Sequence, residues 1–322
     1  MNIGRLILNT RAYKVLEKDI VSNNFSHAYM FVSNDMLYLQ KLEQYILSRI
    51  FCQSNRMPCL ECVECRRVLN NSQPDVMIYP KSDKFNVNEV SNLIGEIYLK
   101  PVEKDFKIFV LNNCDEMNTQ AQNKLLKILE EPPANTHLLL FCKNKSAMLN
   151  TVLSRVKLLE TPPISPEEIF DVIKDEEDVN FAKVAAFNSF GSLQRAEEIL
   201  HKENFLKILD FCYLVCLKLN TEKDLPQVLS KFNSFKDNLE DILNLLQLLL
   251  RDCIMERNGL SKLTVYDSEK ISKINEGFLE KSLAKLILAI NNCRMKLKFN
   301  CNSQAVFDIL CLDIINYKKK NL

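Results

Sequence analysis

Short apolar runs alternate with segments of helical periodicity through the first half of this 322-residue chain. The apolar runs have the length of buried strands and lie at residues 28–32, 76–79, 108–111 and 138–141. Between them, residues 87–99 and 119–129 place apolar side chains at helical spacing. Asn118 would cap the second of these helices, and Pro132-Pro133 would end it. Because strands that alternate with helices are typical of a parallel sheet flanked by helices, we predict an α/β domain here.

The pattern changes after Thr161-Pro162-Pro163, where only helical periodicity follows. Residues 164–203 have the pattern of a short helical unit, which Ser165-Pro166-Glu167-Glu168 would start. Long amphipathic stretches follow at 239–253 and 279–297. We therefore predict three domains, at residues 1–162, 163–204 and 205–322.

Four of the 12 cysteines form a cluster with metal-ligand spacing. They follow the pattern Cys-x6-Cys-x2-Cys-x2-Cys and are Cys52, Cys59, Cys62 and Cys65. Two successive Cys-x2-Cys steps can wrap thiolates around one Zn²⁺ in tetrahedral geometry. Four thiolates leave no open coordination position, so such a metal would be structural. The alternative is four cysteines without metal, with one redox pair at most.

Four thiolates and one Zn²⁺ would carry a formal charge of −2, which basic residues nearby in the sequence can compensate. These residues are Arg56, Arg66 and Arg67. The other eight cysteines are scattered singly or on apolar helical faces. A free thiol in such a place behaves as a small hydrophobic group.

Charge and glycine content narrow the possible functions. Lys plus Arg total 42 and Asp plus Glu total 41, so any contact with nucleic acid must come from a local patch or from partners. Only five residues are glycine and no two lie close together, which excludes a glycine-rich phosphate loop. No apolar stretch approaches the ~20 residues that span a bilayer, and the N-terminus lacks a signal-peptide core. We expect a cytoplasmic protein without membrane contact.

Several segments resemble the AAA+ clamp-loader subunits. The most specific is the end of the run 115–133, where Leu125-Leu126-Lys127-Ile128-Leu129-Glu130-Glu131-Pro132-Pro133 matches a signature of that family. The others are Ser26-His27-Ala28-Tyr29-Met30-Phe31, Gln73-Pro74-Asp75-Val76 and Leu153-Ser154-Arg155-Val156. The resemblance covers about 200 residues. It implies a RecA-like AAA+ domain with an inserted zinc module, a small helical lid domain and an all-α collar domain for oligomerisation.

The chain departs from the ATP-hydrolysing members of this family at each nucleotide-binding motif. Where those members carry Gly-x4-Gly-Lys-Ser/Thr, this chain has Ser33, Asn34 and Asp35, and Asp35 would repel a nucleotide. Neutral Asn112 and Asn113 replace the acidic pair that binds Mg²⁺ and activates water. The sensor positions are also altered, to Cys142-Lys143 and Gln194. We expect no productive ATP binding and no hydrolysis.

This combination is similar to the delta-prime subunits of the bacterial DNA polymerase III clamp loader. The resemblance implies a non-catalytic stator that assembles with gamma/tau-type ATPase subunits and a delta subunit to load the sliding clamp on primed DNA. It also implies that Arg155 is donated in trans to a neighbour's ATP site, with Ser154 fixing the start of the helix that aims it. Glu130 and Glu131 would end a helix and be structural.

Other interpretations remain for the same residues. Arg155 could be a solvated or surface-paired arginine. The whole chain could be an active gamma/tau-type ATPase, against which the missing phosphate-binding lysine argues. It could also be a zinc-dependent nucleic-acid-binding module, against which the near-zero net charge argues.

Overall fold

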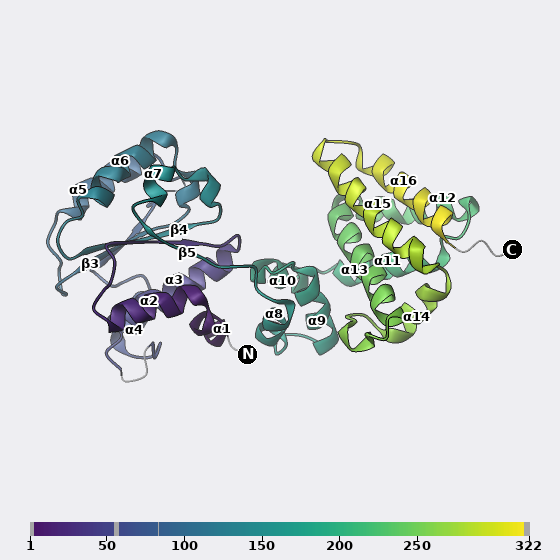
Figure 1. Ribbon diagram of the computed structural model, residues 1–322, viewed down its shortest axis with the longest axis horizontal. Coiled ribbons are helices and arrows are strands. Elements are labelled where there is room, and N and C mark those ends of the chain that lie inside the picture. The colour runs from purple at the N-terminus through teal and green to yellow at the C-terminus, as the bar shows by residue number, and fades with distance from the viewer. Residues whose placement is uncertain (1–2, 55–57, 83, 319–322) are drawn as a thin grey trace. The chain divides into compact units, whose positions relative to one another are not determined.

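A computed structural model describes residues 3–54, 58–82 and 84–318. The chain forms two compact units (Figure 1). The first unit extends to Ile173 and also contains Phe190–Arg195, and the second contains Lys174–Ser189 and the residues from Ala196 onward. In the described part of the chain, no helix combines the length and the apolar character needed to cross a membrane.

The first unit is built on a five-stranded parallel sheet with the strand order β2-β3-β4-β1-β5. Its strands are β1 (Ala28–Val32), β2 (Val76–Tyr79), β3 (Lys107–Leu111), β4 (Thr136–Cys142) and β5 (Lys157–Glu160). The parallel sheet and the four expected strands are therefore confirmed. No strand is predicted from the sequence at β5, which lies at the edge of the sheet and has one buried residue, Leu159. A strand at the edge of a sheet has a neighbouring strand on one side only, so fewer of its side chains are buried and its apolar run is short.

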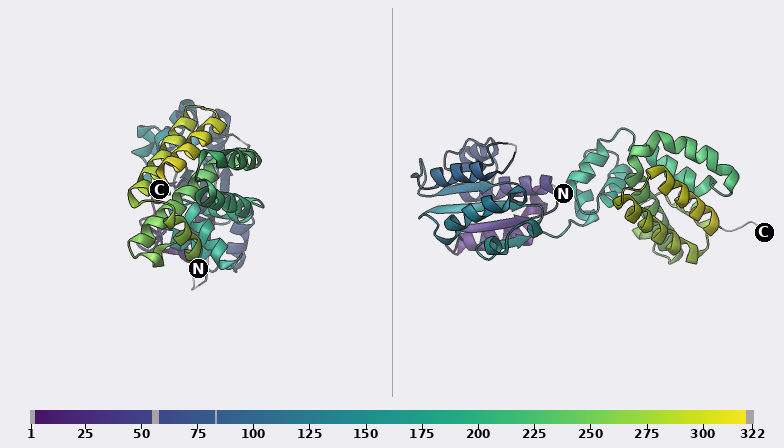
Figure 2. Two further views of the ribbon diagram at one scale, coloured as in Figure 1. Left: turned by 90° about the vertical axis from the view of Figure 1, so that its right-hand side faces the viewer. Right: turned by 90° about the horizontal axis from the view of Figure 1, so that it is seen from above.

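Helices cover both faces of this sheet (Figures 1 and 2). The helices of the first unit are α1 (Ile3–Asn9), α2 (Arg11–Val21), α3 (Met36–Phe51), α4 (Val63–Leu69), α5 (Val87–Ile97), α6 (Thr119–Glu130), α7 (Asn150–Leu153) and α8 (Pro166–Ile173), with short 3₁₀ turns η1 (Cys114–Glu116) and η2 (Lys145–Ala147). α5 and α6 lie on one face, and α2 and α3 lie on the other. The Asn118 side chain accepts the N–H of Ala121 at 2.9 Å, so the predicted cap of α6 is confirmed.

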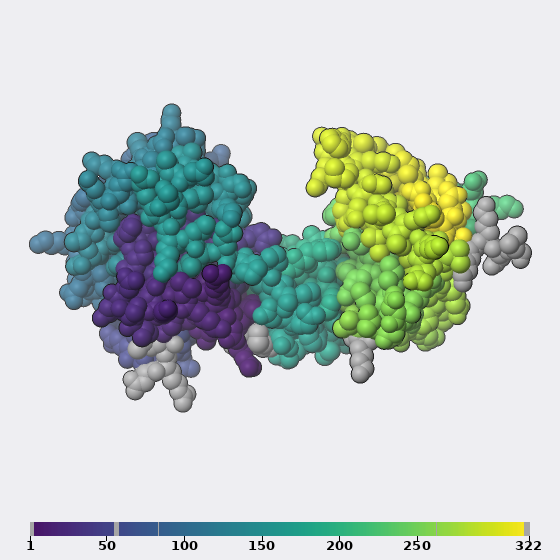
Figure 3. Space-filling view, viewed as in Figure 1, coloured from purple at the N-terminus to yellow at the C-terminus, as the bar shows by residue number. Residues whose placement is uncertain are grey.

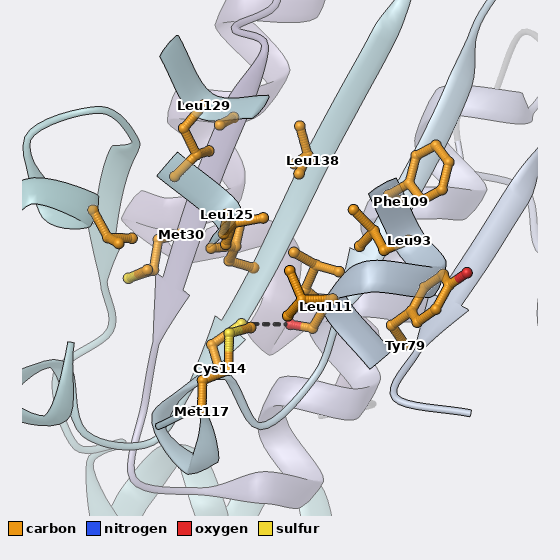
Figure 4. Close-up of a cluster of buried hydrophobic side chains, with 14 of the residues drawn as sticks. Met30, Tyr79, Leu93, Phe109, Leu111, Cys114, Met117, Leu125, Leu129 and Leu138 are labelled. Atoms are coloured by element: carbon orange, nitrogen blue, oxygen red, sulfur yellow. Dashed lines mark hydrogen bonds between the residues drawn. The ribbon is translucent and has the colours of Figure 1, made fainter. Parts of the chain in front are cut away.

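A continuous apolar core lies between the sheet and the helices α5 and α6 (Figure 4). Met30, Phe109 and Leu138 from neighbouring strands meet Leu93 of α5 and Leu125 of α6, all of them fully buried. Side chains packed at this density fix the sheet, and with it the positions of the loops that follow the strands. The turn after β3 is fixed further, because the Cys114 thiol donates to the Leu111 carbonyl at 3.0 Å.

The second unit is helical. It contains α9 (Val179–Asn188), most of α10 (Leu193–Leu200), α11 (Phe205–Lys218), α12 (Leu225–Phe232), α13 (Leu239–Arg257), α14 (Ser268–Glu276), α15 (Glu280–Lys298) and α16 (Ser303–Tyr317), with 3₁₀ turns η3 (Glu222–Asp224), η4 (Asn233–Asn238) and η5 (Ser261–Leu263). The two long helices expected at 239–253 and 279–297 are confirmed as α13 and α15. The division into three domains stays a prediction.

Gly191, two residues before the start of α10, has a backbone conformation that other residues rarely adopt. Its φ is +84°, and its carbonyl accepts the N–H of Ile164 at 3.1 Å. A Cβ atom on this residue would lie 2.6 Å from the Cβ of Pro163 and 3.0 Å from the Ile164 carbonyl oxygen. Both the backbone conformation and the close contact therefore require glycine.

We predict that Gly191→Ala lowers the free energy of unfolding by about 2–3 kcal/mol, from left-handed strain plus a contact with backbone. Gly95→Ala is the matched control, because this residue lies inside α5 with no atom within 4 Å of the added Cβ. The control should be about 0.5–1 kcal/mol more stable than the wild type. Urea unfolding of the three proteins measures the difference, and equal stability of Gly191→Ala and the wild type would contradict the assignment.

Candidate functional sites

The turn from β1 into α3 contains Ser33, Asn34 and Asp35, and its central feature is the buried carboxylate of Asp35. This side chain is 1% exposed. One carboxylate oxygen accepts the N–H of Tyr38 at 2.9 Å and so caps α3. The other oxygen accepts the N–H groups of Leu193 and Gln194 at the start of α10. The acidic group expected to repel a nucleotide is therefore turned inward and bound by the protein's own backbone.

The end of β3 is occupied by two asparagines that also face inward. The Asn112 amide donates to the Glu43 carboxyl of α3 at 3.0 Å. Asn113 has a left-handed backbone with φ of 53°, and its buried Oδ1 atom has no hydrogen-bond partner among the described residues. Neither side chain offers a negative charge to a metal ion.

A cavity of about 380 Å³ lies between the first turns of α3 and the ends of β2 and β3. Among the described residues that line it are Met36, Gln40, Tyr79, Asn112 and Phe141. None of its described lining residues carries a charge. These residues offer neither a cation of the kind that binds phosphate nor a carboxylate of the kind that binds Mg²⁺.

Glu43 accepts a hydrogen bond from Asn112, which lines this cavity, and was not expected from the sequence as part of a site. It is 8% exposed, and burial raises the pKa of its carboxyl to about 7, although the hydrogen bond from Asn112 opposes this shift. The sequence does contain a signal for it. Glu43 falls on the face of α3 that Leu39, Leu42 and Ile46 define, so helical periodicity places a carboxyl in the core.

Arg155 follows α7 at the surface of the first unit, and its side chain is 34% exposed. One guanidinium nitrogen lies 2.7 Å from the Glu130 carboxylate at the end of α6. Another donates to the Thr151 carbonyl at 2.9 Å and to the Ser154 hydroxyl at 3.2 Å. In this structure the arginine is thus a surface-paired residue, and Glu130, expected to be structural, is its ionic partner.

Ser154 lies at the C-terminal end of α7, so the expectation that it fixes a helix start is wrong. Its hydroxyl donates to the Thr151 carbonyl at 3.1 Å and accepts from Arg155. α7 has only four residues, and it ends where the chain turns into β5. Ser154 therefore lies at the C-terminus of α7, and from there its hydroxyl contacts Arg155, the next residue in the chain.

The altered sensor positions contact the turns that follow β1 and β3. Cys142 ends β4, and burial raises the pKa of its thiol to about 12, so it stays a neutral apolar group. The backbone N–H of Lys143 donates to the Asp115 carboxylate at 3.1 Å. The backbone N–H of Gln194 donates to Asp35 at 3.2 Å.

The four predicted cysteines converge on one point between α3 and α4. Their sulfur atoms all lie within 4.8 Å of one another, with separations of 3.5 Å between Cys52 and Cys59 and 3.9 Å between Cys59 and Cys65. Sulfur atoms around a tetrahedral Zn²⁺ at ~2.3 Å lie about 3.8 Å apart. The cluster can therefore hold a metal ion of this size, ligated by Cys52, Cys59, Cys62 and Cys65.

Backbone N–H groups favour the thiolate at two of the four cysteines, whereas burial raises the pKa of Cys65. The N–H groups of Glu61 and Cys62 lower the pKa of the Cys59 thiol to about 6. The Cys62 sulfur caps α4 by accepting the N–H of Cys65 at 3.4 Å, which lowers the pKa of Cys62. Of the arginines expected to balance the charge, Arg67 pairs with Glu103 at 2.7 Å, and Arg56 lies outside the described residues.

We predict that Glu43→Gln makes the protein more stable than the wild type above pH 7. The pKa of Glu43 is raised on folding from 4.5 to about 7, so the folded state binds more protons between these values. The wild type therefore loses stability as the pH rises through this range, by an amount on the order of 3 kcal/mol, and the neutral glutamine does not.

Chemical unfolding at pH 5 and pH 8 measures this effect, with Glu276→Gln at the exposed end of α14 as a control that should follow the wild type. A stability difference between Glu43→Gln and the wild type that stays constant from pH 5 to pH 8 would contradict the raised pKa.

Comparison with known proteins finds similarity to subunits of DNA polymerase III. Residues 8–165 match the family model described as DNA polymerase III, delta subunit. The DNA polymerase III subunit delta' of Bacillus subtilis (strain 168) is 24% identical over 315 residues, which cover 95% of this chain and 95% of that protein. The delta' subunit of Yersinia pestis is 35% identical over 117 residues, 34% of each chain. The tau subunit of Bacillus subtilis is 20% identical over 332 residues, covering 94% of this chain and 59% of that protein.

The family match covers the sheet of the first unit through β5, and the similarity to the Bacillus subtilis subunit continues through the helices of the second unit. The parallel sheet flanked by helices and the cysteine cluster agree with the fold that the motifs implied. On these grounds the chain resembles the delta' subunit of DNA polymerase III over almost its whole length, and the family match spans about half of it.

Proposed function

We propose that this protein is a non-hydrolysing subunit of the bacterial DNA polymerase III clamp loader. It assembles in the cytoplasm with gamma/tau-type ATPase subunits and a delta subunit to load the sliding clamp on primed DNA. Within that assembly it donates Arg155 to the ATP site of a neighbouring subunit. The observation that carries this proposal is the contrast between an uncharged cavity at its own nucleotide position and a half-exposed arginine at the surface.

The chain's own nucleotide position supports the non-hydrolysing role. The loop after β1 has no lysine, its one carboxylate is bound to three backbone N–H groups, and the end of β3 carries amides. Phosphoryl transfer depends on Mg²⁺ and on cationic groups around the phosphates. The described groups at this position supply neither.

The weak contacts that Arg155 makes within this chain support its donation to a neighbouring subunit. An exposed ion pair such as Arg155–Glu130 contributes only about 0–1 kcal/mol. A phosphate offers more negative charge than a carboxylate and the same bidentate geometry to a guanidinium. Arg155 can therefore exchange Glu130 for a neighbour's phosphate at little cost, and Glu130 holds the side chain in place until then.

Assembly is supported by the outer faces of the last two helices. Exposed apolar residues follow one side of α15 at helical spacing, with Leu288 at 62%, Met295 at 50% and the cap residue Phe299 at 77% exposure. The adjacent α16 adds Ile309 and Leu312. Both helices lie at the surface of the second unit (Figure 3). Apolar stripes on helices pack against helices of another subunit.

We predict that Arg155→Ala leaves assembly with the ATPase partner intact and lowers the DNA-stimulated ATPase activity of the complex by at least about tenfold. An arginine supplied in trans contributes up to about 10³–10⁵ in GTPases, which sets the ceiling. Size-exclusion chromatography of the mixed subunits measures assembly, and steady-state ATP turnover with primed DNA measures activity. Arg155→Lys should not restore the activity, because an ammonium lacks the planar fork.

Glu130→Gln is the matched control, because it removes the ion pair and keeps the arginine, so its complex should retain turnover. Unchanged turnover in the Arg155→Ala complex would refute the donated arginine. Tight binding and turnover of ATP·Mg²⁺ by the purified chain alone would favour the gamma/tau-type ATPase. Sub-micromolar binding of the isolated chain to primed DNA at physiological salt would favour a nucleic-acid-binding module.

We further propose that the cysteine cluster holds one structural Zn²⁺. Thiolate ligands in a tetrahedral set favour zinc, and four of them close the coordination shell. The ion would join the end of α3, at Cys52, to the start of α4, at Cys62. The four cysteines would bind the ion and order the segment between α3 and α4, without taking part in a reaction.

We predict one zinc per chain by elemental analysis of the purified protein. Cys59→Ser or treatment with a strong chelator should remove the metal and lower the melting temperature by several degrees, because metal binding is coupled to folding of the insertion. Cys301→Ser is the control, since this cysteine is exposed and lies outside the cluster, and it should keep both metal and melting temperature. A metal-free wild type with the same melting temperature would contradict the zinc assignment.

A further inference from the structure

Two helix N-termini meet at a single carboxylate in the first unit. The Asp35 side chain accepts the N–H of Tyr38 in the first turn of α3 and the N–H groups of Leu193 and Gln194 in the first turn of α10. These two segments lie 158 residues apart in the chain, and the carboxylate that joins them is almost completely buried. An ordinary capping residue serves only the helix that it precedes.

The electrostatics of this arrangement favour an anion. The first N–H groups of a helix have no partner inside the helix, and the helix dipole adds a partial positive charge of about half a unit at that end. Two such ends that face one another would repel without a negative charge between them. In α/β proteins that bind nucleotides, the turn from the first strand into its helix holds a phosphate for the same reason.

We propose that the Asp35 carboxylate is a built-in substitute for a ligand phosphate and ties the start of α10 to the start of α3 without any nucleotide. This inference deepens the proposed non-hydrolysing function and rests on it. Asp35 is a positioning residue, and its carboxylate takes the place that a ligand anion would occupy. The start of α10 is then held in one position whatever the concentration of ATP.

The surrounding residues are shaped for this contact. The backbone N–H of Asp35 donates to the Ser33 hydroxyl at 3.3 Å, which helps to orient the carboxylate. Gly191 turns the chain with its positive φ immediately before the first N–H groups of α10. Each carboxylate oxygen serves one helix, so replacement of one oxygen by an N–H₂ group leaves an acceptor for only one of the two.

The test is hydrogen exchange of the full-length chain, measured by mass spectrometry on peptides that contain Tyr38 and on peptides that contain Leu193 and Gln194. In Asp35→Ala, both segments should exchange faster, by ~10-fold or more, because both sets of N–H groups lose their acceptor. In Asp35→Asn, which remains a good N-cap residue, one segment should stay protected and the other should not.

Asp178→Ala is the matched control. Asp178 caps α9 by accepting the N–H groups of Asn180 and Phe181, so its loss should speed exchange there and leave α10 unchanged. Faster exchange only around Tyr38 in Asp35→Ala would show an ordinary cap of α3 and overturn the proposal. Full protection of both segments in Asp35→Asn would overturn it as well.

A separate measurement, with ATP·Mg²⁺ added, distinguishes failure of this proposal from failure of the proposed function. ATP·Mg²⁺ added to the wild type should leave exchange at both segments unchanged. Protection by ATP would contradict the expected absence of nucleotide binding, and with it the substitution of ligand by side chain. Exchange that is unaffected by ATP, together with unchanged α10 exchange in Asp35→Ala, would overturn only the role of Asp35.

Discussion

Parallel pairing of β1 with β4, and of β4 with β3, brings the carboxyl ends of these strands to one edge of the sheet. Ser33, Asn112 and Cys142 are therefore neighbours at that edge although they are distant in the chain. The core between the sheet and α5 and α6 keeps the edge fixed, because close-packed side chains resist local rearrangement. The groups that follow β1, β3 and β4 are placed by this one arrangement.

The carboxyl groups near that edge are buried and hydrogen-bonded to other groups of the protein. Asp35 is bound by backbone N–H groups, and Glu43 is buried under Asn112 with a raised pKa. In an ATPase, the same edge would need groups that remain available to phosphate and Mg²⁺. Arg155 is the opposite case, because it is half-exposed and held by a weak surface ion pair. This distribution of charge agrees with a subunit that contributes to a neighbour's site and not to its own.

The cysteine cluster differs from that edge of the sheet in its chemistry, because it offers sulfur ligands to a metal ion. It begins where α3 ends and closes at the N-terminus of α4, so a metal there would fix the return of the chain toward β2. Its backbone N–H groups lower the pKa of Cys59 and Cys62 and prepare thiolates for a cation. A closed set of four sulfur ligands adds stability and order without adding a reaction.

Local pattern alone determined four of the five strands, the capped helix α6 and the spacing of the cysteine ligands, because burial and capping depend on residues within a few positions of one another. The tertiary structure decided the rest: the edge strand β5, the Glu43–Asn112 contact, the Arg155–Glu130 pair and the contact of Asp35 with α10. Each of these depends on which segments the sheet brings together, and neither the periodicity nor the composition of a single segment contains that information.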